Sequence, residues 1–413
     1  MNTALPADAP ARSVKRSVIL VLGALSAFGP LSLDLYLPAL PELSEDLGVS
    51  SVTGQLTMTA CMIGLALGQL LVGPMSDRFG RRNPLLIGVT VYAIASLLCA
   101  LTPGAGTLIA LRLVQGLAGG AGIVIARAIV RDLFETRAAA RIFSLLAMVT
   151  GVAPVLAPVL GGQLLNVTSW RGLFVALSLI GCALLIAALL TIEESHPDRA
   201  EGGLRTAITN IATVCRDRRF LGFTLVVAFG SGMMFTYITM SSFVLQDDYG
   251  LSSQAFSFAF AANACGMIAT ASVSSVLVTR IGPMRTLWLG VSIGVAASAL
   301  LAVGALADLP LAVLLVPLFV AVSSVALVMP NATALGLEFH GARAGAAAGV
   351  MGLVQFGVGS ALGPGASTVG TSMVTMGFTM LASSAVGLLI LLVTTRTTRP
   401  RPEHTSVVES DAG

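Results

Sequence analysis

The chain has 413 residues, of which 55% are hydrophobic and 10% are charged, and its formal net charge is +3. Soluble domains carry about 25% charged residues, so this composition excludes a water-soluble fold. The 44 Gly and 18 Pro indicate helices that pack closely and are interrupted in places. The sequence therefore predicts an all-α polytopic membrane protein.

Apolar runs of about twenty residues, the length that crosses a bilayer, recur along the chain between polar breaks. Twelve spans are predicted, at 17–40, 51–73, 84–102, 106–130, 140–165, 171–192, 219–245, 254–278, 286–306, 309–336, 343–367 and 371–394. The longest internal polar stretch divides them six and six. We expect an N-terminal tail at 1–16, a six-helix bundle at 17–192, a linker at 193–218, a second six-helix bundle at 219–394 and a tail at 395–413.

Positive residues are distributed unevenly between the two sides of these spans. If both termini are cytoplasmic, Arg171 is the only one of the 22 Arg and one Lys on the outer side, and only Arg112 lies well inside a span. The outer loops carry acidic residues instead. Because short cytoplasmic loops are enriched in positive residues, the sequence predicts a multi-pass protein of the cell (inner) membrane with both termini in the cytoplasm.

The first span contains Asp34, roughly two turns before its far end. Of the 20 Asp and Glu, Asp34 is the only one well inside an apolar run. An ionisable group at that depth is costly and by default marks a pathway or a proton relay. The alternative is a carboxylate that reaches interfacial water from a helix end. The run is too long for a cleaved signal peptide, so we interpret it as a membrane helix.

A turn between the second and third spans, Gly73-Pro-Met-Ser-Asp77-Arg78-Phe-Gly80-Arg81-Arg82, combines a carboxylate with three guanidinium groups. Asp77 could face the N-terminus of a helix in the other half, and the arginines could pair with acids or lipid phosphates. We predict that this turn gates the cytoplasmic side, through Gly73, Asp77, Arg78, Gly80, Arg81 and Arg82. An ordinary positive loop would explain the arginines but not the spacing of Gly and Asp.

The two halves of the chain repeat. A shift of 202 residues places Arg78-Phe-Gly80 on Arg280-Ile-Gly282, and the following Leu85, Gly88 and Val89 on Leu287, Gly290 and Val291. Parallel repeats of this kind indicate a transporter with its site between the halves. Chance similarity between short loops is the alternative.

Arg112, in the fourth span, is the second charge inside the membrane. By rise per residue it lies at about the depth of Asp34, and Gln115 lies nearly one turn deeper on the same face. We predict that Asp34 and Arg112 couple transport to protons and that Gln115 lines the substrate cavity. Arg112 is expected near Asp34, but not in a tight bidentate pair in every state. The alternative is an arginine that only binds backbone carbonyls and holds helices together.

The fifth span carries Pro154 and Pro158, which lack a backbone donor and clash with the preceding turn. With Gly151, Gly161 and Gly162 they predict a kinked helix that packs closely on a neighbour, or one that is merely bent.

Polar, aromatic and Met residues of the second-half spans are candidates for the cavity wall, with ordinary interhelical packing as the alternative. Such a wall suits varied amphipathic ligands. The candidates are Met233, Tyr237, Asn263, Asn331, Gln355 and Phe356.

Several segments resemble one family. Gly73–Leu85 resembles the loop-2/3 motif of the major facilitator superfamily (MFS), and the degenerate copy at Arg280–Leu287 lies where that superfamily has one. Leu33–Pro41 resembles the first-helix motif of its twelve-span drug:proton antiporters, in particular the bicyclomycin/chloramphenicol-resistance (Bcr/CflA) subfamily. Arg112–Gly116 is similar to the fourth-helix motif of the same group.

Gly151–Gly162 resembles the fifth-helix antiporter motif, with Ala157 where a Gly is often seen. Trp170, Arg171 and Phe174 match the start of the family's sixth helix. The resemblance implies the MFS fold of two six-helix bundles and contact between the fifth and eighth spans. It also implies coupled exchange of the transported species rather than an uncoupled leak. Its layout covers residues 15–395, but its sharp motifs all lie in the first half.

These observations predict a proton-coupled multidrug efflux transporter, a drug:proton antiporter that works by alternating access. A single acid in the core favours neutral substrates, such as those of the phenicol and bicyclomycin type, or monocations. The alternative is a proton-coupled symporter that imports a small metabolite, because it also needs a membrane carboxylate. The first-helix and fifth-span motifs favour export.

No enzyme is expected, because the sequence has no His/Glu metal cluster and no Ser/His pairing in its spans, and its three His lie in polar loops or the tail. We expect no cofactor, no metal and no nucleic acid. The expected partners are a small-molecule substrate, protons and the lipid bilayer, with a functional monomer.

Overall fold

The computed structural model describes residues 16–134, 136–195, 209, 211–338, 340 and 343–397. Within these ranges the chain forms helices and no strand, and twelve helical segments are long and apolar enough to cross a membrane. The predicted all-α class and the twelve spans are confirmed. Most of the predicted tails and linker lies outside the described residues.

The first span is a series of short helices, whereas the next five spans are single helices. The first consists of α1 (Arg16–Ser26), α2 (Phe28–Asp34), the 3₁₀ turn η1 (Leu37–Ala39) and α3 (Leu40–Asp46). The others are α4 (Ser51–Phe79), α5 (Arg82–Leu101), α6 (Ala105–Leu133), α7 (Thr136–Leu164) and α8 (Trp170–Thr191).

The second half has the same number of spans. Its first span is α10 (Arg218–Phe243) followed by the π-turn η2 (Val244–Asp248). The others are α11 (Ser253–Ile281), α12 (Pro283–Leu306), α13 (Leu311–Leu337), α14 (Ala344–Ser367) and α15 (Met373–Thr397). Several helices run past their predicted ends, because polar residues continue the helix beyond the apolar run.

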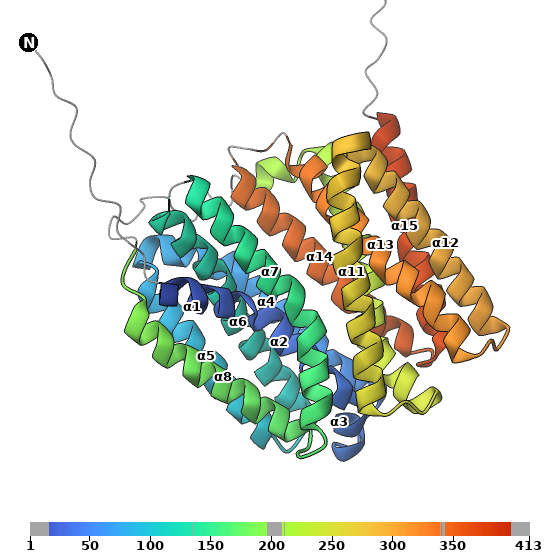
Figure 1. Ribbon diagram of the computed structural model, residues 1–413, viewed down its shortest axis with the longest axis horizontal. Helices are drawn as coiled ribbons and strands as arrows, with labels where there is room; N and C mark the ends of the chain where they lie inside the picture. Colours follow the sequence, from blue (N-terminus) through green and yellow to red (C-terminus); the bar gives the residue numbers. More distant parts are fainter. Residues whose placement is uncertain are drawn as a thin grey trace, which may run out of the picture.

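The helices of each half pack mainly on one another (Figure 1). In the first half α4 packs along α6, and α5 along α8; in the second, α10 packs on α14 and α15, and α12 on α13. The two bundles meet chiefly where α4 contacts α14 and where α7 contacts α11.

The internal repeat extends to backbone conformation. The same 202-residue shift places α4 on α11, from the N-cap serines Ser50 and Ser252 to the closing glycines Gly80 and Gly282. Each glycine has a positive φ, +87° and +83°, a region that an L side chain avoids. The repeated turns therefore share one strained geometry that only glycine adopts at low cost.

The ends of the bundles differ in charge. One end, here called the arginine-rich end, carries the loops at 79–82, 133–136, 281–283 and 337–344. The other, the acidic end, carries the loops at 46–51, 101–105, 164–170, 248–253, 306–311 and 367–373. The positive-residue distribution predicts that the arginine-rich end is cytoplasmic.

The bundles are hydrogen-bonded to each other toward the acidic end, beginning with α4 and α14. Gln55 and Ser367 are both buried and bond reciprocally, with Nε2 to Oγ at 2.9 Å and Oγ to Oε1 at 3.1 Å. One turn deeper, Thr59 donates to the carbonyl of Ser360 at 2.8 Å. Near the surface, the hydroxyls of Ser51 and Thr371 are 2.9 Å apart.

Further bonds of this kind join the second bundle to the first span and to α7. Ser242 donates to the carbonyl of Leu37 at 2.7 Å, and Gln246 donates to that of Pro38 at 3.1 Å. Gln254 of α11 donates to the carbonyl of Gly162 at 3.2 Å. Among the described residues, the hydrogen bonds between the bundles all lie in the half toward the acidic end. That end is closed.

Candidate functional site

The first span changes course beside Asp34. α2 ends at Asp34, and η1 begins three residues later. Pro38 has no N–H to bond the carbonyl of Asp34, and Pro41 has none for that of Leu37, so the α-helical ladder is interrupted twice. Interrupted helices line binding sites in transporters because their freed backbone groups can bind partners.

The Asp34 side chain is 5% exposed, and within the described part of the chain it has neither a hydrogen bond nor an ion pair. The buried phenol of Tyr237, in the second bundle, lies within the electrostatic range of this carboxyl. An unpaired buried carboxylate is costly, so such a group is suited to take up and release a proton.

Arg112 is fully buried in α6, and its guanidinium is bound on several sides. Nη2 donates to the carbonyl of Ser32 at 2.7 Å, Nε to that of Thr57 at 3.4 Å, and Nη1 to Oε1 of Gln115 at 2.5 Å. The guanidinium also lies over the rings of Tyr36 at 4.3 Å and Phe174 at 5.4 Å. Carbonyl dipoles and aromatic faces thus stabilise the charge without a carboxylate.

The structure brings Arg112 close to the turn that holds Asp34 but forms no ion pair between them in the described residues. Their predicted coupling stays a prediction. Gln115 is also fully buried, and its Nε2 donates to Ser96 Oγ at 2.7 Å. Both ends of its amide are therefore bound inside the first bundle in this conformation.

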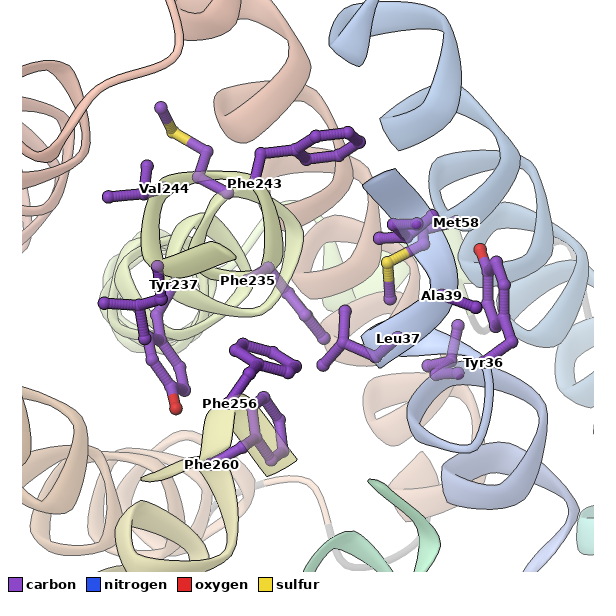
Figure 2. Close-up of a cluster of buried hydrophobic side chains, with 14 of the residues drawn as sticks. Tyr36, Leu37, Ala39, Met58, Phe235, Tyr237, Phe243, Val244, Phe256 and Phe260 are labelled. Atoms are coloured by element: carbon purple, nitrogen blue, oxygen red, sulfur yellow. The ribbon is translucent and has the colours of Figure 1, made fainter. Parts of the chain in front are cut away.

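Tyr237 and Asn263 form a buried polar pair in the second bundle. Asn263 Nδ2 donates to Tyr237 Oη at 3.0 Å and to the carbonyl of Ala259 at 3.1 Å, while its Oδ1 has no partner. The phenol ring stacks on Phe260 at 5.3 Å. Figure 2 shows Phe235 and Phe256 pointing toward Leu37 of the first bundle, with Tyr237 on the side of Phe256 away from Leu37.

The other predicted cavity residues are distributed through the second bundle. Met233 is buried, and its sulfur accepts from Ser298 at 3.4 Å. Asn331 is buried and donates to Ser274 Oγ at 3.1 Å. Gln355 and Phe356 are half-buried on α14, where Phe356 packs on Phe235 at 5.5 Å between centroids. Met233 and Asn331 thus have partners within their own bundle.

The helix α7 contains Pro154 and Pro158 and remains helical through both. A methyl group at Gly161 would collide with the carbonyl of Leu35, beside Asp34, and one at Gly162 would collide with Ser257 of α11. Gly151 has open space around it. Two of the three predicted glycines therefore mark close approaches, one to the interrupted first span and one to the eighth span.

The turn between α4 and α5 is a charged cluster within the first bundle. Arg81 is 2% exposed and pairs with Asp77 at 2.5 Å and with Asp132 of α6 at 2.9 Å. Burial alone would lower the pKa of Arg81, but its bonds to Asp132 and Asp77 outweigh that effect and raise it. Arg81 therefore stays charged and holds two carboxylates together.

A second acid closes the same turn. Glu194, just beyond α8, accepts the backbone N–H of Arg81 at 2.8 Å and that of Arg82 at 3.1 Å, the free donors at the start of α5. A side chain at Gly80 would occupy the space of this carboxylate. Gly73 lies against Val124, and Arg78 stacks on Phe79 at 5.4 Å.

The sequence model of the Major Facilitator Superfamily matches residues 20–364. The chain belongs to this superfamily. It is a membrane transporter and not an enzyme, as predicted.

Relatives and solved structures agree with this family. A Bacillus subtilis protein described as an uncharacterized MFS-type transporter, YdgK, is 37% identical over 92% of this chain and 96% of its own length. The Haemophilus influenzae bicyclomycin resistance protein homolog is 35% identical over 84% of this chain and 87% of its own. A crystal structure of a mutant form of the nucleoside transporter NupG has a TM-score of 0.74, with 13% identity, over 92% of this chain and 100% of that one. The predicted fold and the resemblance to the bicyclomycin/chloramphenicol-resistance group of the MFS are confirmed.

Sequence reasoning overlooked the polar residues that join the bundles and the acids that brace the α4–α5 turn. Ser51, Gln55 and Thr59 recur every fourth residue, so they share one face of an apolar span, and this periodicity could have revealed the contact with α14. Asp132 and Glu194 carry no comparable pattern. Their role depends on the packing that brings the ends of α6 and α8 next to the turn between α4 and α5.

Proposed function

We propose that this MFS protein is a proton-driven exporter of small, largely uncharged compounds that works by alternating access. In an outward-open state Asp34 takes up a proton. After the bundles rock inward, Asp34 releases the proton as substrate enters the space between them. One charge moved through 100 mV supplies about 2.3 kcal/mol, so exchange for a proton can drive uphill efflux.

The observation that carries this proposal is the burial of Asp34 at an interrupted helix, with no hydrogen bond or ion pair to any residue that the structure describes. Arg112 has backbone and amide partners of its own, so Asp34 is free to change its protonation without breaking an ion pair. The closed acidic end supports the same cycle. With the arginine-rich end in the cytoplasm, the hydrogen bonds between the bundles close the outer side in this conformation.

The relatives support the direction of transport. A relative named for bicyclomycin resistance favours export of an antibiotic-like compound rather than import of a nutrient. Phenicols and bicyclomycin-type compounds are therefore the substrates that we propose first, with the site complete in one chain.

Transport in proteoliposomes with an imposed pH gradient tests the proposal, with radiolabelled chloramphenicol as the probe. We expect uphill movement of the drug against the proton flux, abolished by Asp34→Asn. The matched control is Asp308→Asn, the same chemical change at a carboxylate in the 306–311 loop, where a positive φ of 50° suits Asn. Uphill transport by Asp34→Asn, or movement of drug and protons in the same direction, would contradict the proposal.

A further inference from the structure

We propose that Tyr237, oriented by Asn263, is the residue of the second bundle that responds to the protonation state of Asp34. Its phenol O–H donates a hydrogen bond, directly or through one water molecule, to the ionised carboxylate, and protonation of Asp34 releases it. Tyr237 is thus a positioning residue that joins the bundles when Asp34 is charged. This inference rests on the proton-coupled function proposed above.

The phenol of Tyr237 is held as a hydrogen-bond donor. Tyr237 Oη accepts the amide hydrogen of Asn263, so its own hydrogen is available to another acceptor. The amide cannot turn over, because its nitrogen also donates to the carbonyl of Ala259, and a turned oxygen would face that carbonyl. Asn263 therefore keeps Tyr237 as a donor.

Tyr237 and Asp34 lie at a similar level along their helices. α10 is fixed to the first span where Ser242 and Gln246 bind the carbonyls of Leu37 and Pro38. Tyr237 precedes Ser242 by five residues, about 7.5 Å along the helix, and Asp34 precedes Leu37 by three residues, about 5–6 Å. Both side chains lie on the same side of this contact at similar depth, on opposite bundles.

Asp34, and not Arg112, is the charged side chain associated with Tyr237. Asp34 is the charged group that acts on the Tyr237 phenol among the described residues. The Arg112 guanidinium is bound within the first bundle instead, by the carbonyls of Ser32 and Thr57 and the amide oxygen of Gln115. Tyr237 is thus the donor of the second bundle that is placed to meet the charge of Asp34.

Infrared spectroscopy of the purified full-length protein tests this inference. The carbonyl stretch of the protonated Asp34 carboxyl is identified as the band that Asp34→Asn removes, and it is followed as the pH changes. Tyr237→Phe removes one oxygen atom. We expect Tyr237→Phe to change the frequency of the band. We also expect the band to disappear roughly one pH unit higher than in wild type, because the ionised carboxylate loses a hydrogen-bond donor. Asn263→Leu, which frees the phenol to rotate, is expected to move it in the same direction by less.

The control is Tyr92→Phe, an equally buried phenol of the first bundle that bonds Ser32 at 2.8 Å and stacks on Phe28. It is expected to leave the band unchanged, since its hydroxyl bonds Ser32 and not the Asp34 carboxyl. An identical titration of the band in wild type and Tyr237→Phe would overturn the inference while leaving the proposed function intact. Absence of any titrating Asp34 band, or uphill transport by Asp34→Asn, would instead overturn the proposed function.

Discussion

Arg112 donates its Nη2 hydrogen to the carbonyl oxygen of Ser32 at 2.7 Å, two residues before Asp34, and makes no ion pair with the Asp34 carboxylate in the described structure. The fixed positive charge thus holds the backbone of the turn, while the acid beside it stays unpaired. Arg112 therefore has a structural role, whereas Asp34 is the group that can exchange a proton.

Arg112→Lys is the first test of that division. A lysine keeps the charge, but its ammonium cannot reach the carbonyls of Ser32 and Thr57 and the amide of Gln115 with the same geometry. We expect the variant to lose roughly 2–4 kcal/mol of stability, because buried acceptors lose charged donors. Thermal unfolding in detergent measures this. Unchanged stability would show that these bonds do not hold the turn.

Coupling between the two charges is the second prediction. We expect Arg112→Ala to change the titration of Asp34 in reconstituted protein, because Arg112 binds the segment that carries the acid. The infrared band of Asp34 gives the measurement. A titration identical to that of wild type would defeat the coupling predicted from the sequence.

Gly161→Ala is expected to reduce transport at least about tenfold. Its methyl group would meet the backbone carbonyl of Leu35, which cannot rotate away as a flexible side chain would, so α7 must move from the turn beside Asp34. Gly106→Ala in α6 is the control, since a methyl group there meets nothing within 4 Å. Initial rates of drug uptake into inverted vesicles, normalised to protein amount, compare the two. Equal rates would exclude a required close approach at Gly161.

Closure of the acidic end depends on the buried pair Gln55 and Ser367. Gln55→Leu leaves the Ser367 hydroxyl unpaired in the closed state, at a cost of roughly 1–3 kcal/mol, and water can satisfy that hydroxyl when the end opens. We expect the ratio of closed to open molecules to fall about fivefold or more. Cross-linking of cysteines introduced at 51 and 371, whose hydroxyls are 2.9 Å apart in the closed state, reports it. An undiminished cross-linking rate would argue that apolar contacts alone close this end.

The repeated glycines provide a paired prediction. Gly80→Ala and Gly282→Ala both force a methyl group onto a positive φ, at about 1 kcal/mol or more each. Only at Gly80 would the methyl group also meet the Glu194 carboxylate, whereas nothing lies within 4 Å at Gly282. Gly80→Ala is therefore expected to be the more destabilising, by thermal unfolding. Equal destabilisation would mean that Glu194 moves aside freely.

Span positions, the halfway division and the repeated turn followed from the sequence because each has a local physical cause. A bilayer demands about twenty apolar residues in a row, and a positive φ at Gly80 and Gly282 demands glycine. Asp34 was identified for the same reason: the free-energy cost of an ionisable group inside a span depends on the apolar residues next to it in the chain.

Pairing between side chains far apart in the chain followed only from the tertiary structure. Arg112 was placed at the depth of Asp34, yet rise per residue cannot say whether it meets the carboxylate or the carbonyl of Ser32 two residues earlier. Glu194 was assigned to a linker, and the fold places it on the start of α5, 112 and 113 residues away in sequence.

By itself, the sequence determined that this protein has twelve apolar spans, carries one acid deep in the first of them and resembles the drug:proton antiporters of its superfamily in its motifs. Only the tertiary structure decided that Arg112 binds backbone while Asp34 has no partner among the described residues, and that the acidic end is the one where hydrogen bonds join the bundles. The reason is physical: burial and helix-forming tendency are set by neighbours along the chain, whereas hydrogen bonds are set by directions that exist only once the helices are packed.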